Sequence, residues 1–365
     1  MSEFMNARTE RNIFYRRLLA SASAFALLTS AGLSNAFASD DSERPTMWIE
    51  LGGQLEGLTT TQDPFAPAFL TRTPRPSFET VHPLDAEKPP QYSVGGEGKF
   101  IFEPEDSNWV FSAAIRYGRS NGNKIVHQQT SHPPLSFSSS FQVTPYDDNY
   151  ANTNVAHRQS HAVVDFQAGK DFGLGMFGKG GSSVLSLGVR YAQFSSSTTA
   201  NIRERPDVHA KGVIKYFHSY GLMGHAAREF RGVGPSLDWN TSAPFAGNPE
   251  TEFTFDWGLN AAILFGRQKA IVSHHTSGRY VKVKYGTVVP APYETGNARN
   301  DARAVTIPNL GGFAGVSVKF PNAKVSLGYR ADFFFGAVDG GIDARKRENA
   351  GFYGPFASIS IGLGG

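Results

Sequence analysis

A histidine and a serine of catalytic potential lie close together in the segment Ser273 to Gly278, where one residue separates His275 from Ser277. Residues two positions apart share one face of a strand, so the imidazole could approach the hydroxyl and activate it as a nucleophile. Such chemistry also needs a third group that orients the imidazole, and the sequence offers no compelling acid or amide for it. We therefore predict that the protein is not an enzyme, that it has no catalytic residue, and that both side chains lie in a polar part of a strand.

Other signals for chemistry are weaker. The segment Asp339 to Asp343 has the carboxylates and glycines of a calcium loop without the ligand spacing of an EF-hand, so we expect an ordinary external turn. The ten histidines show no zinc spacing, and no glycine-rich phosphate loop is present. The absence of cysteine excludes a disulfide scaffold, a thiolate metal site and a lipid-anchored lipoprotein. We expect no cofactor and no metal.

The first 38 residues have the three regions of a secretory signal peptide. Four arginines, the last at Arg17, precede an apolar stretch from Leu18 to about Leu33, and Ala36-Phe37-Ala38 forms a cleavage site. A membrane anchor is the weaker alternative, because a spanning helix needs about 20 predominantly apolar residues. We predict cleavage after Ala38 and a mature domain of residues 39–365. Cleavage removes four arginines and two glutamates and lowers the formal net charge from +3 to +1, so nucleic acid is not an expected partner.

The mature chain repeats segments of about ten residues in which every second residue is apolar or glycine. In the clearest one, Ala323 to Phe335, the polar face is interrupted only by Phe334. The segment from Trp109 to Tyr117 also has aromatic residues at both ends, as membrane interfaces favour. No run after residue 38 approaches about 18 consecutive apolar residues, so a membrane-spanning form would have to be a closed barrel.

These segments predict an all-β fold, a transmembrane antiparallel up-and-down β-barrel of about 12 strands with both termini in the periplasm. That count requires a poorly patterned strand at Val208 to Tyr220, a turn at Gly221 to Gly224 and a periplasmic turn at Gly266 to Lys269. It also requires outer loops at residues 120–157 and 286–302. Counts from about 10 to about 16 are alternatives, as is a secreted soluble β-sandwich, whose strands alternate as well.

Ten charged residues of the polar faces are predicted to line the lumen, because charge facing lipid costs about 2 to 4 kcal/mol near mid-bilayer. They are Glu50, Glu97, Lys99, Arg116, Asp165, Arg190, Asp256, Lys319, Arg330 and Asp332. Their mixed sign predicts weak ion selectivity if they contact solute. Alternatively, they form ladders between neighbouring strands that brace or fill the lumen. The sequence leaves both interpretations open.

Four stretches, Ser160–Gly175, Phe230–Leu237, Leu327–Gly336 and Phe352–Phe356, resemble the Legionella-type major outer-membrane protein family. The resemblance implies a pore-forming barrel, a porin of a Gram-negative outer membrane. Its expected partners are outer-membrane lipid, the barrel-assembly machinery, and the small hydrophilic solutes or ions whose passive transport it allows. The ending Gly364-Gly365 departs from the terminal aromatic that many bacterial barrels present to that machinery.

Two other functions remain as alternatives. One is an outer-membrane lipid hydrolase that uses the His-x-Ser pair at 275–277, whose spacing is similar to that of outer-membrane deacylases and phospholipases. The other is a surface adhesin or structural barrel in which the outer loops matter more than the lumen. The lipid-facing residues show no obvious subunit interface, and the sequence leaves a homo-oligomer open.

Overall fold

Every described element of regular secondary structure is a β-strand. The computed structural model describes residues 46–59, 92–131, 148–173, 181–205, 208–209, 215–248, 250–284, 287–342 and 344–363. The predicted signal peptide and its cleavage site lie outside the described residues. Within these ranges, no helix has the length and apolarity needed to cross a membrane.

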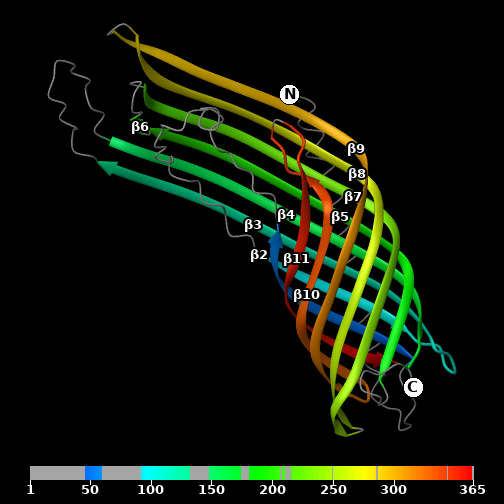
Figure 1. The fold of residues 1–365 in the computed structure, drawn as a ribbon. Coiled ribbons are helices and arrows are strands. Elements are labelled where there is room, and N and C mark those ends of the chain that lie inside the picture. The colour runs from blue at the N-terminus through cyan, green and yellow to red at the C-terminus, as the bar shows by residue number, and fades with distance from the viewer. Residues whose placement is uncertain are drawn as a thin grey trace.

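Ten strands form a closed antiparallel ring. In the ring order β5-β4-β3-β2-β1-β11-β10-β9-β8-β7, each strand pairs with the next, and pairing of β5 with β7 closes the circle (Figure 1). A further short strand, β6, pairs only with β7 and lies outside the ring. The bounds are β1 Met47–Thr59, β2 Tyr92–Phe102, β3 Trp109–Ser131, β4 Asp148–Asp171, β5 Ser182–Arg205, β6 Val208–His209, β7 Lys215–Asn248, β8 Thr251–Lys284, β9 Thr287–Phe320, β10 Ala323–Asp339 and β11 Arg347–Leu363.

The predicted count of 12 strands is wrong, and β7 shows one reason. Of the expected strand from Val208 to Tyr220, the structure describes Val208–His209 as β6 and Lys215–Tyr220 as the start of β7, and residues 210–214 lie outside the described ranges. The expected turn at Gly221 to Gly224 is wrong, because β7 runs through these glycines without a break. Gly221 pairs with Arg203 of β5 on one side and with Ser277 of β8 on the other. Glycine inside a strand resembles a turn in the sequence, but pairing on both sides keeps the backbone extended.

The same error affects β8 and β9. The predicted periplasmic turn at Gly266 to Lys269 lies in the middle of β8, where Gly266 pairs with Gly232 and Val305. The predicted outer loop at 286–302 belongs mostly to β9, which begins at Thr287. Likewise, 120–131 and 148–157 of the predicted loop at 120–157 are paired strand, and the intervening residues lie outside the described ranges.

Strand lengths divide the molecule into two regions. Strands β1, β2, β10 and β11 have 11 to 17 residues, whereas β3, β4, β5, β7, β8 and β9 have 23 to 34. Figure 1 shows the long strands continuing past the short ones as a curved sheet. We call this sheet, formed by the parts of β3, β4, β5, β7, β8 and β9 that extend beyond the short strands, the wing. At about 3.3 Å per residue the longest strands extend about 110 Å, and a tilted strand of about 9–11 residues already spans a bilayer.

The barrel is apolar outside and polar or packed inside. On β10, Leu327 and Tyr329 are 57% and 51% exposed on the outer face, whereas Asp332 and Phe334 are buried on the inner face. The other ring strands follow the same alternation, so the outer surface carries many exposed large hydrophobic side chains. A soluble β-sandwich is therefore the wrong alternative, since its apolar faces would be buried between two sheets.

Candidate functional site inside the barrel

Arg190 of β5 lies at the centre of a buried polar network in the lumen. Its Nε donates to Oδ1 of Asp165 at 2.6 Å and its Nη2 to Oδ2 at 3.1 Å. Its Nη1 donates to the side-chain oxygens of Asn260 and Asn309 at 2.6 and 2.5 Å, and Asp238 lies 3.9 Å from Nη2. The guanidinium is thus held from β4, β7, β8 and β9, which together with β5 form one continuous half of the ring.

Two more arginines extend this network. Nη1 of Arg116 donates to Oδ2 of Asp332 at 2.5 Å, and its Nη2 lies 3.7 Å from Asp165. Arg330 donates to Glu97. Paired, hydrogen-bonded charges of this kind are tolerated in a dry interior because each desolvated group keeps an opposite partner. We call Glu97, Arg116, Asp165, Arg190, Asp238, Arg330 and Asp332 the ion-pair cluster.

The structure brings six of the ten predicted lumen residues together in this cluster: Glu97, Arg116, Asp165, Arg190, Arg330 and Asp332. The other four lie on the inner face but apart from it. Asp256 pairs with Lys324 at 2.7 Å, and Glu50 lies opposite Lys99 in the register of β1 and β2. Lys319 stands two residues beyond buried Ser317, at the end of β9. For the six, the ion pairs favour the bracing interpretation over free contact with solute.

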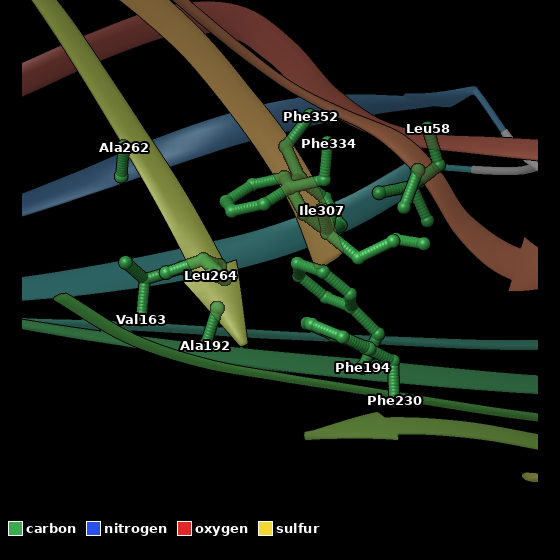
Figure 2. Close-up of a cluster of buried hydrophobic side chains, with 12 residues drawn as sticks. Leu58, Val163, Ala192, Phe194, Phe230, Ala262, Leu264, Ile307, Phe334 and Phe352 are labelled. Atoms are coloured by element: carbon green, nitrogen blue, oxygen red, sulfur yellow. The ribbon is translucent and has the colours of Figure 1, made fainter. Parts of the chain in front are cut away.

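A second layer of the lumen is apolar. Four phenylalanines meet there, with ring centroids 4.6 Å apart for Phe194 and Phe334, 5.7 Å for Phe194 and Phe230, and 5.4 Å for Phe194 and Phe352. Figure 2 shows their side chains pointing toward one another from different strands. This apolar plug comprises Leu58, Val163, Ala192, Phe194, Phe230, Ala262, Leu264, Ile307, Phe334, Ala337, Ala350 and Phe352, all at most 6% exposed.

The sequence analysis missed the plug. Phe334 stood out only as an interruption of a polar face, yet it is fully buried in the lumen. Phe194, Phe230 and Phe352 lie at inner-face positions of their strands. An apolar residue at an inward position was the available signal, but only the ring order shows that the four side chains meet.

A buried histidine and glutamate join the two layers. Nε2 of His161 lies 3.3 Å from Oε1 of Glu56, and the imidazole stacks on Phe352 with centroids 3.8 Å apart. A cavity of about 20 Å³ lies beside them, lined partly by Gln54 and Arg116, and has room for about one water molecule. Side chains thus fill the lumen at this level.

The His-x-Ser motif lies on the outer face of the wing, far along β8. Nε2 of His275 lies 3.2 Å from Oε1 of Glu294, and both side chains are largely exposed. Glu294 pairs with Ser277 in the register of β8 and β9. The sequence analysis missed this carboxylate because it lay in a predicted loop. Among the described contacts, His275 and Ser277 share no hydrogen bond of the kind that joins a serine nucleophile to its base.

The predicted turn at Asp339 to Asp343 is held by hydrogen bonds of its own. Asp339 accepts a hydrogen bond from Nη1 of Arg299 at 2.8 Å and others from the backbone amides of Gly341 and Lys346. Asp343 lies outside the described residues. Across the described part of the chain, no group of three or more His, Cys, Asp or Glu side chains is placed to hold a metal ion.

Comparison with known proteins supplies no family. No family model matches the chain, and no curated protein matches it. Among solved structures, the transport unit of the autotransporter AIDA-I from Escherichia coli is 10% identical, with a TM-score of 0.25, covering 93% of this chain and 97% of that one. The TodX deltaS2S3 mutant, a monoaromatic hydrocarbon channel, is 10% identical, with a TM-score of 0.22, covering 90% and 91%. Likenesses at this level carry no functional argument.

Proposed function

We propose that the protein is an integral barrel of a bacterial outer membrane whose lumen is a narrow pore for small ions and hydrophilic solutes, held shut by the apolar plug. The observation that carries this proposal is the inverted polarity of the closed ring. Apolar side chains cover its outside, and paired charges fill part of its inside. A closed ring with an apolar outer band satisfies every backbone polar group in lipid.

The apolar band on the outside of the barrel is long enough to cross a membrane and has aromatic residues near its edges. On β8, outward positions from Phe253 to Phe265 are apolar or aromatic, a run of 13 residues, before Arg267 follows. On β3, exposed Trp109 lies at the turn end of the strand, and exposed Tyr117 lies nearer the wing. Aromatic side chains at both edges and apolar ones between them are typical of barrels in lipid.

The lumen supports a pore that opens rarely. A hydrophobic constriction excludes water and ions by dewetting, and the plug is such a constriction. Below it, the ion-pair cluster offers polar groups of both signs, which supports weak selectivity between anions and cations. We propose that passive transport takes place only when the plug rearranges.

Planar-bilayer conductance of the refolded full-length mature chain tests this proposal. We expect rare, small steps from the wild type and larger or more frequent steps from Phe334→Ala, which removes a buried ring from the plug. Phe335→Ala is the matched control, because the next residue points outward and is 43% exposed. Silence of all three proteins would reject the pore, and equal conductance of the two variants would reject the plug as its gate.

A second function is favoured by the wing. Strands of 34 residues place hydrogen-bonded sheet far beyond the apolar band, as a surface adhesin or structural barrel would require. A barrel that inserts into lipid but never conducts would favour this function.

Membership of the Legionella-type major outer-membrane protein family and export with cleavage after Ala38 remain proposals. They are supported by the stretches quoted above and by the pattern of the first 38 residues.

A further inference from the structure

On β7 and β8, the outer surface changes from apolar to basic between two neighbouring rows of residues. One row, connected by strand pairing from β3 to β8, is Ile115, Val164, Tyr191, Val233 and Phe265. The next outward row toward the wing is Tyr117, Ala162, Gln193, Arg231 and Arg267. The edge of the apolar band on this side of the barrel therefore lies between these rows.

Two arginines face each other directly at this edge. Arg231 of β7 pairs with Arg267 of β8 in the antiparallel register, and both side chains are exposed. Lys269 lies one outward position further along β8, opposite Glu229. Like charges directly opposite each other in a sheet are destabilising, so this arrangement has an energetic cost that needs a reason.

The protein neutralises this group only in part. Glu229 pairs with Arg231 on its own strand. The ion pairs of the described residues include none with Arg267 or Lys269. Within the described part of the chain, Arg267 and Lys269 therefore carry positive charge without a carboxylate bound to them. The excess positive charge points outward, next to side chains that suit lipid.

We propose that Arg231, Arg267 and Lys269 bind the phosphate of a membrane lipid in the leaflet that faces the wing. The inference rests on the proposed membrane-spanning function. The apolar row would contact the acyl chains, and the two arginines of the next row lie where an anionic headgroup begins. Guanidinium groups suit this ligand because their planar forks donate paired hydrogen bonds to phosphate oxygens.

The test measures lipid binding to the refolded full-length mature chain in detergent by native mass spectrometry. The probes are phosphatidic acid, which carries a phosphate monoester, and phosphatidylcholine with the same acyl chains. We expect phosphatidic acid to bind more tightly. The double variant Arg231→Gln with Arg267→Gln should lose at least about tenfold in affinity for it, since each substitution removes charge-assisted hydrogen bonds to phosphate.

Arg203→Gln is the matched control, because Arg203 is an exposed arginine on the outer face of β5, 12 residues beyond Tyr191. It should keep the affinity of the wild type. Equal binding of the two lipids, or an unaltered double variant, would overturn the inference. Full displacement of phosphatidic acid by inorganic phosphate would assign the site to free phosphate instead.

A separate measurement distinguishes failure of the lipid-binding proposal from failure of the proposed membrane-spanning function. The wild type and the double variant are mixed with phosphatidylcholine vesicles, and insertion is measured as resistance to extraction with sodium carbonate. If neither inserts, the membrane proposal itself fails. If both insert but show no preference for phosphatidic acid, only the lipid site is rejected.

Discussion

Arg190 and Asp165 lie directly opposite each other on β5 and β4, and two parallel hydrogen bonds of 2.6 and 3.1 Å join them inside the barrel. Both residues are buried. A bidentate pair of this kind is fixed in geometry as well as in charge. The pair therefore joins two neighbouring strands on their inner face, at a position where a wide pore would hold water.

Removing one partner of this pair should be costly. In Arg190→Leu, Asp165 loses its bidentate partner in a desolvated site, and we expect the free energy of unfolding to fall by about 3–5 kcal/mol. Urea unfolding of the protein folded into lipid vesicles measures the change. Arg158→Leu, at an exposed outer position, should change it by no more than about 0.5 kcal/mol. Similar effects of the two substitutions would contradict the role given to the pair.

Adding one methyl group should have different effects on stability at two glycines, Gly234 and Gly96. A Cβ at Gly234 would lie 1.9 Å from the carbonyl oxygen of Ile263, whereas a Cβ at Gly96 would meet open space. We expect Gly234→Ala to destabilise the barrel by about 1–3 kcal/mol through overpacking between β7 and β8. Gly96→Ala should be neutral. The temperature at which each variant loses the gel mobility of the folded barrel measures the difference in stability. A Gly234→Ala variant as stable as the wild type would contradict the close approach of Gly234 to the carbonyl oxygen of Ile263.

The turn between β10 and β11 should loosen in acid. Burial opposes ionisation of Asp339, but hydrogen bonds from Arg299 and from the amides of Lys346 and Gly341 lower the pKa of its carboxyl below the usual value. A carboxyl whose pKa is lower in the folded state than in the unfolded state stabilises the fold at pH values above the unfolded pKa of about 3.9. This stability is lost as the pH falls through the folded pKa. Protection of the Gly341 and Lys346 amides from hydrogen exchange, corrected for intrinsic rates, should therefore persist from neutral pH to about pH 4 and fall below it.

Asp339→Asn supplies the comparison for this pH effect. The variant should show weakened protection of the same amides already at neutral pH and little further loss in acid. Asp106→Asn, in the turn between β2 and β3, should behave like the wild type. Protection in the wild type that is unchanged at the lowest pH would show that the carboxylate does not hold the turn.

The serine of the His-x-Ser motif should be dispensable. His275 pairs with Glu294 on a largely exposed surface, and no hydrogen bond from Ser277 to His275 is present among the described contacts. We expect no release of fatty acid from phospholipid or lipid A by the wild type, and no difference in Ser277→Ala. Deacylation that is measurable in the wild type and falls at least about 100-fold in Ser277→Ala would restore the hydrolase hypothesis.

The fold class and the sidedness of the strands could be predicted from the sequence. Alternation from Val325 to Phe335 is a local property, because successive side chains of a strand point to opposite faces whatever its neighbours are. For the same reason, six of the predicted lumen residues share the inward side of their strands, where they form ion pairs. The partners of Arg190 could not be predicted, since Asn260 and Asn309 are 70 and 119 residues away along the chain.

The sequence by itself determined an all-β chain with one apolar and one polar face along each strand. Tertiary structure decided that ten strands close the ring, that Gly221 to Gly224 continue a strand instead of ending it, and that four phenylalanines meet in the lumen. The physical reason is that side-chain alternation depends on the geometry of a single strand. Strand continuity, ring closure and lumen packing depend on hydrogen bonds and contacts with residues distant in the chain.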